Sequence, residues 1–73
     1  MTLRQPLSVR EDEVARLIGQ GLAYHAVARE LGIAERTVRQ YVERIASKLP
    51  PAAGDITPYK RVYLWAATHL LGA

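Results

Sequence analysis

Glycine and proline residues divide the 73-residue chain into short segments, and these breaks most constrain its fold. Gly21 and Gly32 suit the left-handed conformation that closes a helix, and Pro50-Pro51 cannot continue one. Between the breaks, apolar residues recur at helical spacing and no run alternates as a strand does. We therefore expect an all-α fold in one domain, residues 1–73. The sequence predicts a four-helix bundle with helices over about 9–20, 23–31, 35–49 and 58–71.

Two of the expected helix starts carry a capping sequence. Ser8 followed by Glu11 fits a capping box, in which the hydroxyl and the carboxylate each accept a backbone N–H of the first turn. Thr57 before Pro58 combines a capping hydroxyl with proline at the first helical position. These signals predict where the first and last helices begin.

The residue types present exclude several classes of function. The chain has no cysteine, which excludes disulfides, thiolate zinc sites and thiol nucleophiles. Its two histidines, His25 and His69, are interpreted as surface residues, and no Ser/His/Asp or paired-carboxylate arrangement has a pocket to occupy. We therefore expect no enzyme activity, no catalytic residue, no metal-binding residue and no cofactor.

Hydropathy and charge indicate where the protein acts and on what. No apolar run approaches the roughly 18 residues of a membrane span, and Met1–Pro6 lacks the apolar core of a signal peptide. We expect a soluble, cytoplasmic protein with no membrane partner. Ten Lys and Arg against seven Asp and Glu give a net charge of +3 and a pI of 9.7. A pI above about 9 is typical of nucleic-acid-binding domains.

The segment 35–49 carries the main functional signal. On a helical projection its apolar residues form one narrow arc, and the opposite side is polar. The apolar residues are Val38, Val42, Ile45 and Leu49, and the polar ones are Arg36, Arg39, Gln40, Glu43 and Ser47. Arginine can donate to guanine or phosphate, glutamine can bind adenine, and glutamate can accept from cytosine. An ordinary solvated face is the alternative interpretation. The tight turn at Gly32-Ile33 and the small residues before it favour a helix-turn-helix over 23–49.

The order of several short motifs resembles a known family. Residues 7–14, LSVREDEV, are similar to L-T-x-R-E-x-E-V, the opening of the LuxR/GerE-type DNA-binding domain. Residues 27–33, VARELGI, are similar to I-A-x-x-L-x-I, and ERTVR at 35–39 begins a pattern that continues to Lys48-Leu49. The resemblance covers about residues 7–49. It implies a transcriptional regulator that binds double-stranded DNA, reading the major groove with the helix over 35–49.

The resemblance also implies roles for particular residues. The base-reading positions fall on Arg39, Gln40 and Glu43. Contacts to DNA phosphates are expected from Tyr24, His25, Arg36, Thr37 and Arg44. The chain departs from the family at Ala23 and Ala34, where capping hydroxyls are usual, and at Glu43, a position that is often basic. The link from Pro50 to Pro58 is also longer than usual.

The last expected helix, 58–71, is apolar over much of its circumference. The family's fourth helix often dimerises, so we expect a homodimer interface along Val62, Trp65, Ala66 and Leu70. The alternative is a single broad face that closes the core, with Trp65 as its plug. Because the chain is short, we expect a stand-alone regulator, or else the output domain of a larger one.

Two other functions remain open from the sequence. One is a region-four-like domain of a sigma factor, which would bind core RNA polymerase and share the helix-turn-helix. The other is a protein-interaction module that binds a regulatory protein through the last helix, with the helix-turn-helix degenerate. Salt-dependent binding to random DNA separates the DNA-binding hypotheses from the interaction module.

Overall fold

The computed structural model describes residues 6–50, 54 and 56–71 of the chain. Within these ranges it contains four helices and no strand, which confirms the all-α fold class. The helices are α1 (Val9–Gly19), α2 (Tyr24–Leu31), α3 (Glu35–Lys48) and α4 (Pro58–His69). Each expected helix is present, with its ends within two residues of the predicted ones.

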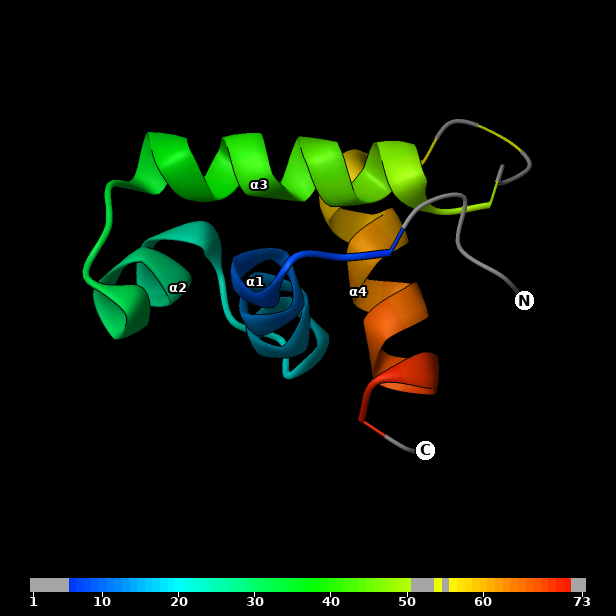
Figure 1. Ribbon diagram of the computed structural model, residues 1–73, viewed down its shortest axis with the longest axis horizontal. Coiled ribbons are helices and arrows are strands. Elements are labelled where there is room, and N and C mark those ends of the chain that lie inside the picture. Colours follow the sequence, from blue (N-terminus) through cyan, green and yellow to red (C-terminus); the bar gives the residue numbers. More distant parts are fainter. Residues whose placement is uncertain (1–5, 51–53, 55, 72–73) are drawn as a thin grey trace.

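The four helices share one hydrophobic core, with α1 at its centre. In Figure 1, α3 runs across the top of the view, α2 lies beneath its first turns, and α4 lies beside its other end. Helix α1 is seen nearly end-on and packs against each of the other three. The largest fully buried side chains are Ile18, Ile45, Val14, Val27, Val38, Val42 and Val62. Because every helix except α1 gives one apolar side to α1, the outer sides of α2, α3 and α4 face solvent.

The predicted helix caps at Ser8 and Thr57 are confirmed. The Ser8 Oγ accepts from the Glu11 N–H at 3.1 Å, and a Glu11 carboxylate oxygen accepts from the Ser8 N–H at 2.9 Å. The Thr57 hydroxyl accepts from the Lys60 N–H at 3.2 Å. Helices α2 and α3 instead begin after Ala23 and Ala34, which have no side-chain hydrogen bond to give. Two helices are therefore capped by side chains and two are not.

A buried ion pair joins the start of α1 to the end of α3. The Lys48 ammonium donates to a Glu11 carboxylate oxygen at 2.6 Å, and Glu11 is only 4% exposed. Burial raises the pKa of Glu11, but the hydrogen bonds from Lys48 and Ser8 outweigh it, so the pKa lies below its ordinary value. The Glu11 carboxylate thus serves the capping box and anchors the last turn of α3.

Helices α1 and α4 approach each other closely at Gly19. A Cβ built on Gly19 would meet the Ala66 Cβ at 2.9 Å, nearer than two such atoms normally approach. Arg16 adds a second link, because it bonds Asp12 at 2.7 Å and also donates to the Leu70 carbonyl at 3.0 Å. The smallest possible side chain at Gly19 therefore sets how closely α4 packs on α1.

The connection from α3 to α4 is only partly described. Arg61 donates to the Pro50 carbonyl at 3.2 Å, so the end of α3 is bonded to the first turns of α4. The expectation of a longer link over Pro50–Pro58 falls mostly on residues outside the described ranges. Among the residues that are described, no helix is long and apolar enough to cross a bilayer.

Candidate nucleic-acid interface

The polar residues of α3 lie on its outer side, as the helical projection predicted. Opposite them, Val38, Val42 and Ile45 are 0% exposed and hold the helix to the core. We call the exposed set the α3 polar face; it consists of Arg36, Arg39, Gln40, Glu43 and Ser47. The three predicted base-reading residues, Arg39, Gln40 and Glu43, therefore share one solvent-facing surface. Thr37, at the edge of this face, is half-buried.

Arg39 is held in place by two neighbours. One is Glu35, one turn earlier, whose carboxylate accepts from the guanidinium at 3.2 Å. The other is Tyr24 of α2, whose ring centroid lies 5.1 Å below the guanidinium carbon. A cation over an aromatic face is attracted by the ring's quadrupole. Because the Arg39 side chain is still 60% exposed, its donors remain free to meet a ligand.

Arg44 has a similar but more local arrangement. Its guanidinium carbon lies 5.7 Å from the ring centroid of Tyr41, three residues earlier on the same helix. The Ser47 hydroxyl donates to the Arg44 carbonyl at 2.6 Å. The Arg44 partner thus comes from α3 itself, whereas the aromatic partner of Arg39 comes from a different helix.

The start of α2 borders the α3 polar face. Burial raises the pKa of the Tyr24 phenol; the Arg39 charge opposes this rise, and Glu43 and Tyr59 add to it. Tyr24, Arg39 and Glu43 are therefore near enough to influence one another electrostatically. His25 is exposed beside Tyr24, and α2 begins here without a side-chain cap. The first N–H groups of α2 therefore lie next to the predicted DNA-contacting side chains.

The helix α4 corrects part of the dimer prediction. Val62 and Ala66 are both 0% exposed and pack in the core, so neither side chain can reach a second copy. Trp65 and Leu70, the other two predicted interface residues, are half-buried against the core. The error arose because apolar residues surround most of α4, so the sequence did not show which side would meet α1.

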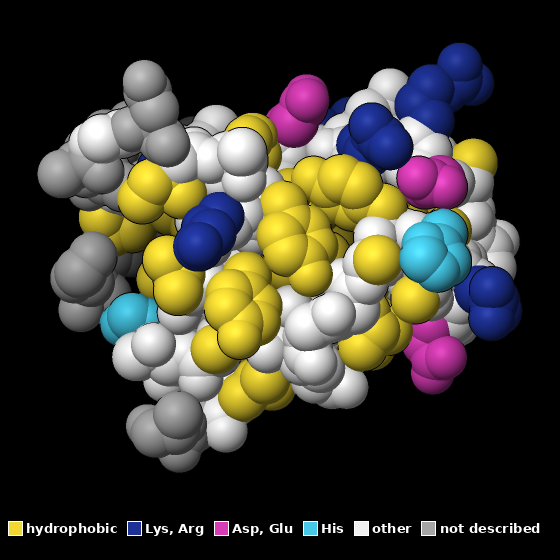
Figure 2. Space-filling view, turned by 180° about the vertical axis from the view of Figure 1, so that it is seen from behind, with side chains coloured by type: hydrophobic (Ala, Val, Ile, Leu, Met, Phe, Trp, Pro, Cys, Tyr) yellow, Lys and Arg dark blue, Asp and Glu magenta, His cyan; other side chains and the backbone are white. Residues whose placement is uncertain are grey.

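Other apolar residues are exposed on α4 and just after its end at His69. We call this set the α4 outer stripe: Tyr63 (37% exposed), Leu64 (48%) and Leu71 (40%). Figure 2 shows hydrophobic side chains gathered near the centre of the rear face of the molecule, with Lys and Arg side chains around them.

Tyr59 is a residue that the sequence analysis missed. It lies in the first turn of α4, and its ring meets the Tyr24 ring edge-on, with centroids 5.5 Å apart and planes at 87°. Its hydroxyl donates to the Leu22 carbonyl at 2.9 Å. No local pattern could have indicated this contact, because the two bonded residues are 37 positions apart.

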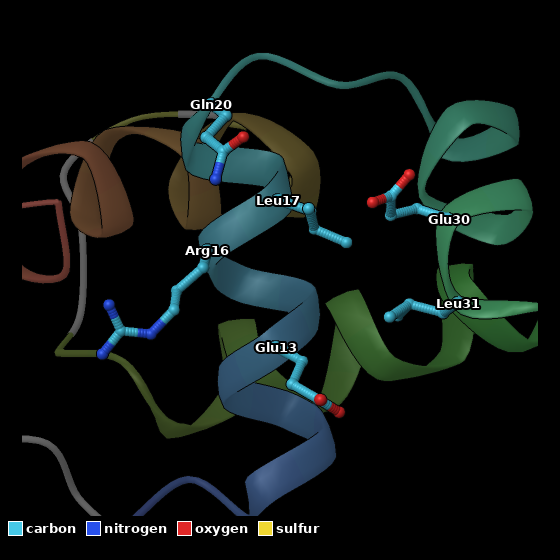
Figure 3. A pocket seen from close by; sticks show the side chains of 6 residues that line it. All are labelled: Glu13, Arg16, Leu17, Gln20, Glu30 and Leu31. Carbon is cyan, nitrogen blue, oxygen red and sulfur yellow. The ribbon is translucent and has the colours of Figure 1, made fainter.

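A surface pocket lies on another part of the molecule, between α1 and α2. It is lined by Glu13, Arg16, Leu17, Gln20, Glu30 and Leu31. Figure 3 shows Leu17 and Leu31 pointing toward each other across it, whereas Arg16 points away. Glu13 forms an ion pair with Arg10 at 3.4 Å. None of the six residues belongs to the α3 polar face, and no group of three or more potential metal ligands occurs within the described ranges.

Comparison with known proteins shows the family. Residues 5–51 match the GerE family model, which describes bacterial regulatory proteins of the luxR family. Over 39 residues the chain is 49% identical to the two-component response regulator PprB of Pseudomonas aeruginosa. That alignment covers 53% of this chain and 14% of the relative, so the chain spans only a small part of that protein's length. No solved structure matches the chain.

The family match covers the same helices that carry the site. It extends from just before α1 to the end of α3, and so includes both helices of the predicted helix-turn-helix. We therefore interpret the helix-turn-helix as that of the luxR family and not as that of a sigma factor. The chain belongs to the luxR family of bacterial regulatory proteins.

Proposed function

We propose that this chain is a regulator of transcription that binds double-stranded DNA sequence-specifically and reads the major groove with α3. The observation that carries the proposal is the α3 polar face. Its two arginines, glutamine and glutamate are all exposed, on the side of α3 opposite the core. A major groove admits one α-helix, and these side chains have the donors and acceptors that distinguish base pairs. Membership of a family of regulatory proteins supports the same function.

We assign base contacts to Arg39, Gln40 and Glu43, and phosphate contacts to residues around them. The phosphate-contacting set is Tyr24, His25, Arg36, Thr37 and Arg44. In support of this division, Arg39 is fixed by Glu35 and Tyr24 while its donors stay exposed. The guanidinium of a base-reading arginine must point in a defined direction, because its two hydrogen bonds to guanine have a strict geometry. Phosphate contacts tolerate more variation in direction because they carry no sequence information.

Binding-site selection followed by Arg39→Ala tests the proposal. We expect the purified protein to select a preferred duplex, and Arg39→Ala to weaken binding to it by about 1–3 kcal/mol. Binding to a scrambled duplex should weaken much less. The matched control is Arg10→Ala, which removes the same charge from another exposed helical ion pair, at 3.4 Å on α1. Equal losses on both duplexes would make Arg39 a phosphate contact, and failure to select any duplex would reject sequence-specific reading.

Glu43 provides an independent test of base reading. A carboxylate next to DNA repels phosphates, but it can accept from a cytosine amino group on the right sequence. Glu43→Gln should therefore raise the affinity for random DNA and reduce discrimination between the preferred and the scrambled duplex. Unchanged affinity for random DNA would mean that Glu43 does not face the groove.

We also propose that two copies associate through the α4 outer stripe. Tyr63 and Leu64 of α4, and Leu71 just after it, are each more than one third exposed. A two-fold pair would present two α3 helices to half-sites about one helical turn apart, or a multiple of it. Leu64→Asp should lower dimer formation on a two-half-site duplex in sedimentation experiments. The control is Val9→Asp, at an 81% exposed residue of α1, which should leave dimer formation unchanged. If the wild-type protein binds each half-site independently, the dimer proposal is rejected.

A further inference from the structure

Tyr59 contacts the predicted DNA-binding residues from outside the helix-turn-helix. It belongs to α4, yet its ring edge packs on Tyr24 at 5.5 Å between centroids. Its hydroxyl donates to the Leu22 carbonyl at 2.9 Å, just before α2 begins. Tyr59 therefore holds both the Tyr24 ring and the backbone that leads into α2.

The Tyr24 ring also contacts Arg39 of α3. The Arg39 guanidinium carbon is 5.1 Å from the Tyr24 ring centroid, and Glu35 accepts from the same group at 3.2 Å. A movement of the Tyr24 ring would remove one of the two partners that direct Arg39. The remaining partner, Glu35, forms an exposed i,i+4 pair, and such pairs hold a side chain only weakly. The Tyr24 ring is therefore needed to fix the direction of Arg39.

Besides backbone hydrogen bonds, a side-chain hydrogen bond from Tyr59 holds the turn before α2. Ala23 stands at the capping position and gives no side-chain hydrogen bond, so the Leu22 carbonyl bond to Tyr59 is a side-chain anchor for this turn. A half-buried tyrosine at an uncapped helix start would otherwise have more rotational freedom. Tyr59 supplies the edge-on ring contact that restricts it.

We infer that Tyr59 is a positioning residue that directs Arg39 through Tyr24, so that the accuracy of base reading by α3 depends on α4. The inference rests on the proposed function, in which Arg39 reads a base. Tyr59 itself needs no contact with DNA. Its effect should be seen in discrimination between base pairs and not in the general affinity for DNA.

The first experiment measures discrimination in a double-mutant cycle. The variants are Tyr59→Leu, which keeps an apolar side chain against the core but removes the ring and hydroxyl, and Tyr59→Phe, which restores the ring. The preferred duplex is compared with one altered at the base pair whose recognition depends on Arg39. We expect Tyr59→Leu to reduce the affinity ratio about threefold to tenfold, and Tyr59→Phe to recover most of it. In the Arg39→Ala background, Tyr59→Leu should have no further effect on the ratio.

The matched control is Trp65→Leu, which also removes an aromatic ring from α4. Trp65 is half-buried against the core, and its ring stacks on His69 at 5.5 Å between centroids. It has no described contact with Tyr24 and does not belong to the α4 outer stripe, so Trp65→Leu should leave the affinity ratio unchanged. An equal reduction by Trp65→Leu and Tyr59→Leu would mean a general effect of α4 on folding and would overturn the inference.

A second experiment needs no DNA. Because the Arg39 guanidinium carbon lies 5.1 Å from the Tyr24 ring centroid, we expect the ring current of Tyr24 to shift the NMR signals of the Arg39 side chain. These signals should move toward those of a free arginine in Tyr59→Leu but not in Trp65→Leu. Unchanged Arg39 signals and an unchanged affinity ratio in a folded Tyr59→Leu protein would overturn the inference. Failure of the wild-type protein to select any DNA sequence would instead reject the proposed function, and the NMR comparison would still decide whether Tyr59 directs Arg39.

Discussion

The helices α1 and α4 begin differently from α2 and α3. Ser8 and Thr57 cap the first pair with side-chain oxygens, whereas Ala23 and Ala34 precede the second pair and provide none. The four helices lie in one small core, so burial alone does not explain the difference. The uncapped pair is the pair that carries the predicted DNA contacts.

The difference separates helix starts that are satisfied within the protein from helix starts that lie beside the proposed DNA contacts. Free N–H groups at a helix start bind anions, because the helix dipole and the unsatisfied donors act together. At α2 and α3 such groups lie beside the proposed phosphate-contacting residues, where a phosphate can take the place of a capping side chain. The α1–α4 crossing and the Glu11–Lys48 pair join helices at places outside the α3 polar face. The predictions below test this division.

The largest expected effect is that of Lys48→Met. It removes the ammonium from a Glu11 carboxylate that is only 4% exposed, while keeping the apolar stem of Lys48. Leaving one member of a buried pair alone is strongly destabilising, and because Lys48 is partly exposed we expect a loss of about 2–3 kcal/mol in the free energy of unfolding. Urea denaturation measures it. A loss no greater than that of the exposed-pair variant Glu35→Gln would contradict the importance of the Glu11–Lys48 pair.

The same pair predicts how stability depends on pH. The pKa of Glu11 is lowered in the folded protein, so this carboxylate binds protons less readily when folded than when unfolded. Its stabilising contribution is therefore complete above the ordinary value of 4.5 and is lost as the pH falls through the lowered value. Denaturation midpoints should decline in that acidic range for the wild type. Glu11→Gln should reduce this decline, and an identical decline in the variant would contradict the assignment.

Gly19→Ala is expected to have the next largest effect. The new methyl group would lie 2.9 Å from the Ala66 Cβ, so α1 and α4 must separate slightly. Overpacking costs about 1–3 kcal/mol, partly offset by the better helix propensity of alanine, about 1 kcal/mol. We expect the free energy of unfolding, measured by thermal denaturation, to fall by up to about 2 kcal/mol. Combining it with Ala66→Gly should restore the helix spacing; if the double variant is as unstable as the sum of the two single ones, the crossing is not limited by this contact.

The smallest effects come from exchanging the caps. Ser8→Ala and Thr57→Ala should each lower the free energy of unfolding by about 1 kcal/mol, and Ala34→Ser should raise it by up to about 1 kcal/mol. Ala26→Ser, at the third residue of α2, is the control that adds a hydroxyl away from the capping position. Chemical denaturation of the free protein measures all four. If Ala34→Ser does not raise the free energy of unfolding, the first N–H groups of α3 gain nothing from a capping side chain. The contrast between the capped and the uncapped helices would then not hold.

The fold and one side of the site could be predicted from local patterns. Glycine, proline and capping residues located the four helices, and the 3.6-residue period separated Arg39, Gln40 and Glu43 from Val38 and Val42. Such features depend on residues within one or two helical turns of each other. The side of α4 that faces α1 could not be predicted in this way, because apolar residues surround most of that helix.

Contacts between distant segments also escaped the sequence analysis. Glu11 was identified as a capping residue, but nothing near it indicated Lys48, 37 positions away. Tyr59 was overlooked because its partners are distant in sequence: Leu22 lies just before α2, and Tyr24 is the first residue of α2. Gly19 lies inside an ordinary helical pattern, and only the crossing with α4 explains why a larger residue would not fit. Each of these contacts requires the relative placement of two helices.

Trp65 is the only tryptophan of the chain, and it lies in α4 against the core. Its ring stacks on His69 at 5.5 Å between centroids, and its indole N–H is buried with no hydrogen-bond partner among the described residues. The protein therefore contains its own fluorescent probe of this one helix. Emission from a buried indole shifts to longer wavelength when water reaches it, so detachment of α4 from the other three helices can be followed in real time without any label.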